Sequence, residues 1–325
     1  MRNYIIRRLL MFIPTLLLVT LIVFGLVHLA PGNVIDAMLA QPGAEELDRP
    51  ALEKALGLDE PFFVRYGRWM GFVPQADGSF SGIFQGDLAD SWWYNTPVID
   101  LVAKALPVTL ELGLMGLIIA QLIALPIGIY SALRQDKWGD YIARSFAILL
   151  ISVPGFWVGT MVIVLPAVWW DYMPSIMLIQ FTDNPIGNLK MFIVPAIVMG
   201  MAMGGMTMRM TRTMMLEVLR QDYIRTAWAK GLRERAVIIR HALKNALIPV
   251  ITIIGIQVPV LIGGTVIIEQ IFMLPGMGRL SIGAVFLRDM PLICGVMIIF
   301  AVGLVLINLM VDLTYGYLDP RVQFK

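Results

Sequence analysis

The sequence predicts an all-α integral membrane protein with six transmembrane helices, and three observations lead to this class. Of the 325 residues, 58% are hydrophobic and only 15% are charged, whereas soluble domains carry about 25% charged residues. Six stretches are apolar over the length of about 20 residues that a helix needs to cross a bilayer core. Lysine and arginine are concentrated in alternate connecting segments, as the positive-inside rule predicts for a multi-pass protein.

The expected spans follow one another along the chain as long apolar runs. The third contains Pro154 and Pro166, and because proline removes a helical hydrogen bond we expect a kink or tilt there. The fourth is short and rich in methionine and glycine. The six spans are Leu9–Leu29, Val108–Tyr130, Ile142–Trp169, Met191–Met206, Pro249–Phe272 and Leu292–Tyr315.

The first apolar run follows three arginines, Arg2, Arg7 and Arg8, and so resembles a secretory signal. Its apolar stretch is longer than the usual 7–15 residues of such a signal, and no small-residue cleavage site follows it. We therefore expect a retained transmembrane helix.

The distribution of basic residues predicts the orientation of the chain. With the N-terminus inside, the inside segments carry 17 of the 25 lysines and arginines, nine of them between Arg209 and Lys244. The outside segments carry the rest over a much longer total length. We therefore expect both termini on the cytoplasmic side.

This topology divides the chain into three parts. Residues 1–30 form the N-terminal helix and first span, and residues 31–106 form an extracytoplasmic loop. Residues 107–325 form a five-span core with a cytoplasmic loop at 209–247.

The extracytoplasmic loop is long enough to contain short helices, which we expect at Pro50–Leu58 and Phe62–Met70, with an irregular stretch at Gly86–Pro97. Trp92, Trp93 and Tyr94 have the amphipathic rings that favour a membrane interface.

The sequence argues against metal and disulfide chemistry. Cys294 is the single cysteine, so no intrachain disulfide and no cysteine-based metal site is expected. His28 and His241 lie far apart in the sequence. We therefore expect no metal site and no metal enzyme.

The cytoplasmic loop is the most informative segment. We expect Asp222 to cap a short helix and Gly231 to end it in the left-handed conformation. A second helix is expected from near Arg233 through Ile238–Leu247 into the fifth span. Four side chains of the short helix have the spacing of one face: Tyr223, Ile224, Ala227 and Trp228. A groove on another protein could receive such a helix; the alternative is a basic loop that only enforces topology.

This segment resembles the ATPase-coupling loop of binding-protein-dependent ABC importer permeases, and is most similar to the branch of dipeptide, oligopeptide and nickel importers. The resemblance covers nearly the whole chain and rests on several motifs in the order typical of the family. They are Tyr223–Leu232, Arg240–Pro249, His28–Gly32, Leu106–Leu112, Glu269–Leu280 and Arg288–Ile293. One departure is Thr226-Ala227-Trp228, where the general importer loop has Glu-Ala-Ala. Trp228 is bulkier than the small or basic residue expected there, which suggests an altered groove on the partner ATPase.

The resemblance implies a type I importer permease bundle in the plasma (inner) membrane of a bacterium or archaeon. The implied partners are a second permease, expected to be a different chain, two ATPase subunits, an extracytoplasmic solute-binding protein and membrane lipid, without nucleic acid. Peptide is the expected solute, with nickel complexes and oligosaccharides as alternatives. The residues expected to couple to the ATPase are Asp222, Tyr223, Arg225, Ala227, Trp228, Lys230 and Gly231.

The lysines support this division of labour independently. A P-loop ends in Gly-Lys-Ser/Thr, yet no lysine of this chain follows a glycine or precedes serine or threonine. We therefore expect no cofactor on this chain, with ATP and magnesium bound by a partner, and no enzymatic activity of its own.

Polar residues within or near the spans are candidates for the translocation path, because charges and amides at such depth tend to face a cavity or a partner. Interhelical hydrogen bonds are the alternative for the amides, and interfacial solvation or a pair with Arg279 or Arg288 is the alternative for the glutamates. The candidates are Gln121, Gln257, Asn308, Glu111 and Glu269.

The segment after the fifth span is a candidate outer gate, with ordinary loop chemistry as the alternative. The gate candidates are Pro275, Gly276, Gly278, Arg288 and Asp289. Five span glycines are expected to permit close helix packing: Gly113, Gly116, Gly200, Gly204 and Gly205.

Three other classes of protein remain as alternatives. An ion-gradient-driven secondary transporter would favour acids at mid-span, where this chain has Gln121 and Gln257. An intramembrane enzyme would need a nucleophile and base, paired acids or metal ligands within the spans, and none is visible. A channel would not need the glycine-broken cytoplasmic helix.

Overall fold

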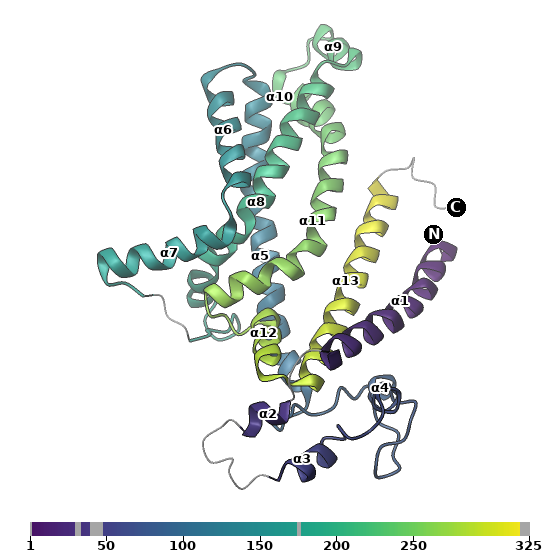
Figure 1. The fold of residues 1–325 in the computed structure, drawn as a ribbon. Helices are drawn as coiled ribbons and strands as arrows, with labels where there is room; N and C mark the ends of the chain where they lie inside the picture. Colours follow the sequence, from purple (N-terminus) through teal and green to yellow (C-terminus); the bar gives the residue numbers. More distant parts are fainter. Residues whose placement is uncertain (1, 30–33, 40–47, 174–176, 319–325) are drawn as a thin grey trace. The chain divides into compact units, whose positions relative to one another are not determined.

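The computed structural model describes residues 2–29, 34–39, 48–173 and 177–318, and these are helical over most of their length (Figure 1). The β-structure among the described residues is one isolated antiparallel bridge between Asp90 and Pro97. An all-α architecture is therefore confirmed.

The chain forms two compact units. Unit 1 combines Met1–Pro107 with Gly276–Leu306, and unit 2 combines Val108–Pro275 with Ile307–Lys325. The sequence analysis placed a boundary next to Pro107, where the units also divide, but it treated everything after that point as one core. The structure instead groups the segment after the fifth span with the N-terminal part.

Five helices among the described residues are long and apolar enough to cross a membrane, and a bent helix pair raises the number to six if it counts as one span. The five helices are α1 (Arg2–Leu29), α5 (Val98–Leu133), α8 (Pro185–Leu219), α11 (Lys244–Ile271) and α13 (Met290–Leu318).

The bent pair lies where the third span was expected. Helices α6 (Trp138–Ser152) and α7 (Gly155–Trp170) meet at 91°. Pro154 is the N-cap of α7, and a residue that precedes proline avoids helical geometry, so the helix breaks at Val153. The expected kink is confirmed at Pro154, whereas Pro166 lies within α7.

Helix α8 is the central helix of unit 2 and is much longer than the short fourth span predicted from the sequence. It begins at Pro185, and the side chain of its N-cap Asn184 accepts a hydrogen bond of 2.9 Å from the Gly187 amide. It packs against α6 and α11. Thr207, Thr211 and Met215 are buried beyond the predicted end, because the helix continues past the apolar run as a packing surface.

Glycines allow this close packing. A Cβ atom on Gly200 would lie 2.6 Å from the Gly116 carbonyl oxygen of α5, and one on Gly205 would lie 2.8 Å from the Ala147 carbonyl oxygen of α6. Since real Cβ atoms do not approach so closely, these contacts require glycine. The expected packing role is confirmed for Gly200 and Gly205.

Unit 1 contains the described helices of residues 31–106, the segment expected to be an extracytoplasmic loop. They are α2 (Val34–Leu39), α3 (Arg49–Ala55), α4 (Phe62–Met70) and the 3-10 turn η2 (Ile83–Gln85). Helix α4 begins and ends where the sequence predicted, and α3 covers the first part of the other predicted helix.

Aromatic packing attaches α4 to the end of α1. Phe24 of α1 contacts the rings of Phe62, Tyr66 and Trp69 at centroid distances of 5.3–5.5 Å. The hydroxyl groups of Thr20 and Tyr66 are also hydrogen-bonded at 2.9 Å. The described part of the loop of residues 31–106 is therefore packed on a long apolar helix within this unit.

Candidate functional site

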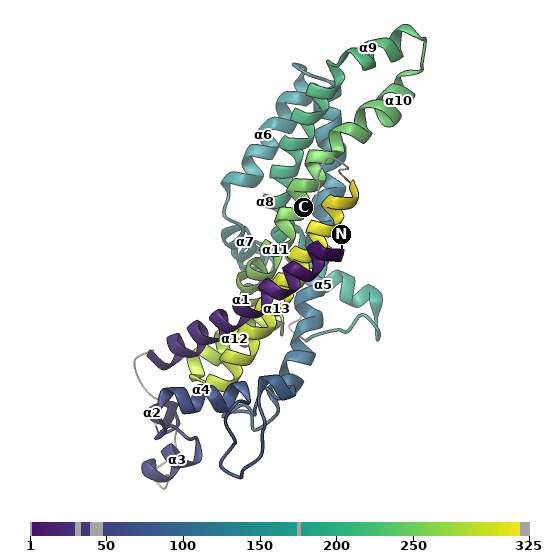
Figure 2. The same cartoon turned by 90° about the vertical axis from the view of Figure 1, so that its right-hand side faces the viewer.

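The predicted cytoplasmic helix exists as α9 (Asp222–Ala229), at the end of unit 2 where α8 ends (Figures 1 and 2). Its N-cap is Gln221, so the expectation that Asp222 is the cap is wrong. Asp222 is the first helical residue. Its negative carboxylate stabilises the helix there, because the helix dipole is positive at the N-terminus. It also accepts a hydrogen bond of 3.2 Å from Arg225.

The glycine break is confirmed. Gly231 has a φ of +74°, which glycine adopts without the steric cost that other residues bear. The chain then turns into α10 (Glu234–Ala236), the π-helical segment η3 (Val237–Leu243) and α11. The second helix therefore begins where expected and continues into the fifth span, although its π-helical segment was not predicted.

The four residues predicted to share one face of α9 divide into two pairs. Ile224 and Ala227 are 1% and 6% exposed, whereas Tyr223 and Trp228 are 43% and 45% exposed. Ile224 and Ala227 belong to one buried cluster with residues of α5, α8, η3 and α11: Ala132, Met215, Val237, Ala242 and Ala246. Ala227, which the sequence analysis assigned to docking, attaches α9 to its own chain through this cluster.

The exposed side of α9 carries the remaining predicted residues. Arg225 and Lys230 are exposed beside Trp228. The Tyr223 hydroxyl accepts a hydrogen bond of 2.8 Å from the side-chain amide of Asn245 on α11. Asn245 was not singled out in the sequence, because its partner lies 22 residues away.

A hollow of about 690 Å³ lies beside this site, at the start of the second helix. Its apolar lining comes from Ile129, Ile238, Ile239 and Leu243, and its charged lining from Arg233, Glu234 and Arg235. Its lining is mixed apolar and charged, which suits a protein partner better than a small polar solute.

A buried ion pair near this end of unit 2 was missed. Asp140 of α6 is fully buried, and both of its carboxylate oxygens accept hydrogen bonds of 2.7 Å from Arg212 of α8. Ser131 of α5 and the Asp136 amide also donate to Asp140. Spacing rules for helices connect residues three or four apart, so no such signal could pair two residues 72 positions apart.

The candidates for the translocation path differ in their surroundings. Gln257 is 8% exposed, accepts from Thr207 at 3.5 Å and donates to the Met203 carbonyl at 3.4 Å. Its surroundings are those of the alternative, an interhelical hydrogen bond. Gln121 is half-buried, and both polar atoms of its side chain are buried without a hydrogen-bond partner in the described part of the chain.

Glu269 is fully buried and accepts a hydrogen bond of 2.7 Å from Thr109 of α5. Solvation at the membrane interface, one of the alternatives to a role in the path, therefore does not apply to Glu269. Glu111 and Asn308 are half-buried on α5 and α13.

The gate candidates also differ in their surroundings. Asp289 is fully buried and caps α13 through a hydrogen bond of 3.2 Å from the Leu292 amide. Ser91 and the Trp93 amide also donate to it. Asp289 therefore attaches the loop of residues 91–93 to the start of α13.

The other gate candidates are placed by α12 (Met277–Leu287). Gly276 is its N-cap, Gly278 is buried in its first turn, and Arg288 ends it in the left-handed conformation with a φ of +55°. Pro275 is an exposed residue of unit 2. The expected loop after the fifth span therefore contains a regular helix.

Comparison with known families decides the class of protein. Residues 124–324 match the binding-protein-dependent transport system inner membrane component, and residues 1–113 match the N-terminal domain of the same kind of component. The chain belongs to this family. It is a permease, as the sequence analysis expected, and neither an ion-driven secondary transporter nor an enzyme.

Relatives of the permease match over its whole length. It is 39% identical over 327 residues to the oligopeptide transport system permease protein AppB of Bacillus subtilis, with 100% of each chain covered. It is 38% identical over 324 residues to a putative peptide transport system permease protein of Brucella abortus, and 36% identical over 348 residues to the dipeptide transport system permease protein DppB of Escherichia coli. These two matches also cover 100% of each chain.

Solved structures support the fold of the permease. The methionine ABC transporter MetNI in inward-facing conformations matches with a TM-score of 0.55 at 14% identity, over 67% of this chain and 96% of that chain. An amino acid ABC transporter crystallised with histidines matches with a TM-score of 0.51 at 13% identity, over 67% and 94%. At this identity the likeness concerns the fold alone.

Proposed function

We propose that this permease carries peptides across the inner membrane as one membrane subunit of an ATP-driven importer. Its full-length relatives are described as oligopeptide, dipeptide and peptide transport permeases, and this shared description supports peptides over nickel complexes or oligosaccharides. An extracytoplasmic binding protein would deliver the peptide, and a second, different permease would complete the path.

The proposed coupling step is supported by one observation: α9 has a buried side and an exposed side. Ile224 and Ala227 attach the helix to α5, α8 and α11, while Tyr223 and Trp228 stay exposed on it. A partner that holds the exposed aromatic residues would therefore move the ends of three long helices together. We assign Tyr223 and Trp228 to contact with an ATPase subunit, with Arg225 and Lys230 at the rim.

Asp222 and Gly231 have supporting roles in this proposal. Asp222 stabilises the first turn of α9 through the helix dipole and through its hydrogen bond from Arg225. Gly231 supplies the left-handed residue at which the chain turns back toward α11. ATP and magnesium would bind to the ATPase subunits. For the path we retain Gln121, because a buried amide without a partner in its own chain is suited to bind a group from outside it.

The experiment measures ATP hydrolysis and peptide uptake together, with the assembled transporter in proteoliposomes. Truncation of a central interface aromatic can cost about 2 kcal/mol or more, so Trp228→Ala should reduce uptake at least tenfold and weaken capture of the ATPase. Trp138→Ala is the matched control, because Trp138 is 83% exposed at the start of α6 and is expected on the same membrane side.

Equal uptake by Trp228→Ala and Trp138→Ala would remove the coupling role of α9. The solute is tested separately by competition, with unlabelled dipeptides, tetrapeptides, nickel complexes and oligosaccharides added outside. Competition by oligosaccharides alone would leave the coupling role standing and overturn the peptide assignment.

A further inference from the structure

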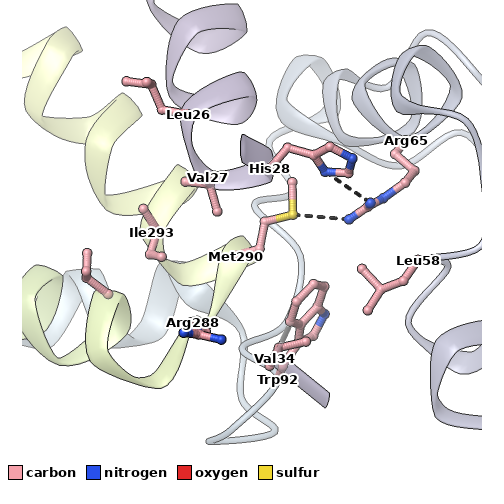
Figure 3. A pocket seen from close by; sticks show the side chains of 11 residues that line it. Leu26, Val27, His28, Val34, Leu58, Arg65, Trp92, Arg288, Met290 and Ile293 are labelled. Atoms are coloured by element: carbon pink, nitrogen blue, oxygen red, sulfur yellow. Dashed lines mark hydrogen bonds between the residues drawn. The ribbon is translucent and has the colours of Figure 1, made fainter. Parts of the chain in front are cut away.

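A second hollow, of about 500 Å³, lies within unit 1 where α1 ends and α13 begins (Figure 3). Leu26 of α1 and Ile293 of α13 contribute apolar walls, and Trp92 lies on the opposite side in the view. None of the described residues cited so far for peptide transport lines this hollow except Arg288, which was a gate candidate.

The polar groups of the hollow are cationic or neutral. Arg65, Arg288 and His28 line it, and its described lining contains no aspartate or glutamate. A hollow with two guanidinium groups and apolar walls favours a ligand that is both anionic and apolar.

Arg65 is half-buried, and its hydrogen bonds to His28 and Met290 join it to neutral acceptors. Its guanidinium lies 3.1 Å from His28 Nδ1 and donates to Met290 Sδ at 3.3 Å (Figure 3). Because guanidinium can only donate, His28 Nδ1 must accept, which places the imidazole proton on Nε2. A thioether sulfur is a weak acceptor, so the hydrogen bond from Arg65 to Met290 is weak.

The nearest acid compensates the charge of Arg65 only in part. Glu60 forms its ion pair with Arg68, at 2.6 Å. Burial lowers the pKa of Arg65, and the opposing effect of Glu60 is smaller. A half-buried cation in this position gains stability from an added anion.

The place of the hollow in the chain indicates where that anion comes from. The apolar window of α1 ends at Leu29, and that of α13 begins at Met290. The hollow therefore lies where two membrane-crossing helices meet the membrane surface, which is the depth of the lipid head groups. Basic pockets between transmembrane helices bind anionic head groups on the cytoplasmic side of membranes, and the same pairing of guanidinium with phosphate is available to a head group in this hollow. Leu26, 63% exposed, offers an apolar surface to an acyl chain.

We propose that this hollow binds an anionic phospholipid, with its phosphate on Arg65 and Arg288 and an acyl chain along Leu26 and Ile293. The lipid would hold the end of α1, α4 and the start of α13 together on the membrane surface. This site is separate from the proposed peptide transport and requires only that α1 and α13 lie in the membrane.

The test is native mass spectrometry of the assembled transporter, with phosphatidylglycerol and phosphatidylethanolamine of identical acyl chains as probes. Each basic residue near a membrane surface contributes about 1 kcal/mol to the binding of anionic lipid, which is about a fivefold change in affinity. Arg65→Gln should therefore weaken phosphatidylglycerol binding about fivefold and leave phosphatidylethanolamine binding unchanged.

Two variants guard against trivial outcomes. Arg49→Gln is the matched control, because Arg49 belongs to the same extracytoplasmic segment and forms ion pairs with Asp36 and Glu53 outside the hollow. If Arg65→Gln does not assemble, Arg288→Asn replaces it, since asparagine tolerates the left-handed conformation of that position. This variant should weaken phosphatidylglycerol binding by a similar factor.

Three results would overturn the proposal. The first is equal binding of both lipids, and the second is equal loss of phosphatidylglycerol in Arg65→Gln and Arg49→Gln. The third is binding of glycerol 1-phosphate, a head group without acyl chains, in the absence of phosphatidylglycerol binding, which would assign the cations to a soluble anion.

Discussion

Asp140 is a fully buried carboxylate, and its environment shows how single residues stabilise unit 2. Arg212 donates to both of its oxygens, and Ser131 and the Asp136 amide add further hydrogen bonds. These bonds join the end of α5, the start of α6 and the C-terminal part of α8. Because Asp140 and Arg212 compensate each other's charge, removal of the Asp140 charge leaves the charge of Arg212 largely buried without compensation.

We therefore predict that Asp140→Asn destabilises the permease by about 3–5 kcal/mol, the usual cost of breaking a buried ion pair from one side. Thermal unfolding in detergent, followed by circular dichroism, measures this loss. Asp136→Asn is the control, because Asp136 is exposed and its left-handed φ of +59° suits asparagine. Equal melting temperatures for the two variants would contradict the structural role of Asp140.

The two mid-span glutamines allow a second prediction at the same scale. Gln257 has two described partners, so Gln257→Ala should cost about 1 kcal/mol of stability. Gln121 has none in the described part of the chain, and removal of an unsatisfied buried amide is close to neutral or stabilising. Thermal unfolding of the isolated permease should therefore show a lower stability for Gln257→Ala than for Gln121→Ala. Peptide uptake by the assembled transporter should fall for Gln121→Ala, because the proposal has the Gln121 side chain contact the solute.

The opposite order of stabilities would reverse the assignment, with Gln121 as the packing residue and Gln257 as the path candidate. The sequence could not make this distinction, because both glutamines lie at similar depth in equally apolar runs. Their difference arises only when α8 places Thr207 and the Met203 carbonyl beside Gln257.

At the scale of single elements, the sequence predicted most about the coupling loop. Gly231 and the apolar spacing of α9 were sufficient to predict a short helix with a left-handed end, and both features are present. The sequence did not predict which of the four residues on that face would be buried. Adjacent residues of a helix point about 100° apart, so Ile224 is buried while its neighbour Tyr223 is not.

The π-helical segment η3 is the element for which sequence patterns gave no signal. Such segments arise where one residue is added to an α-helix, and they are frequent at functional sites. In this permease η3 joins α9, the helix proposed to couple to the ATPase and with which η3 is in contact, to the long apolar helix α11. A change in this segment would therefore alter how α9 is joined to α11.

We predict that deletion of Ile239, which is 51% exposed within η3, converts the segment to α-helix and preserves the register of α11. The variant should fold and insert, but peptide uptake should fall because α9 shifts relative to α11. Deletion of Ile256, 61% exposed within regular α11, is the comparison, because it rotates half of the helix by about 100°. Loss of folding in both deletions alike would argue against a π-specific role.

At the scale of the whole molecule, the sequence predicted the composition of the bundle better than its division into units. The spans could be predicted because the length and apolar composition of a single segment are enough to indicate that it crosses a membrane. The grouping of residues 276–306 with the N-terminal part depends on contacts such as those of Asp289 with Ser91 and Trp93, which are almost 200 positions away. No local pattern reports such a pairing.

Orientation in the membrane is the property on which the coupling proposal depends, and cysteine labelling tests it. In a background with Cys294→Ala, we predict that Trp228→Cys in intact cells reacts with a membrane-permeant maleimide but not with an impermeant one. Phe80→Cys, in the extracytoplasmic loop and 59% exposed, should react with both reagents.

The basis is the excess of lysine and arginine in the segments that include α9, because positive charge is retained on the cytoplasmic side. Labelling of Trp228→Cys by the impermeant reagent would place α9 outside, where no ATPase could bind it, and the coupling role would then have to belong to another segment.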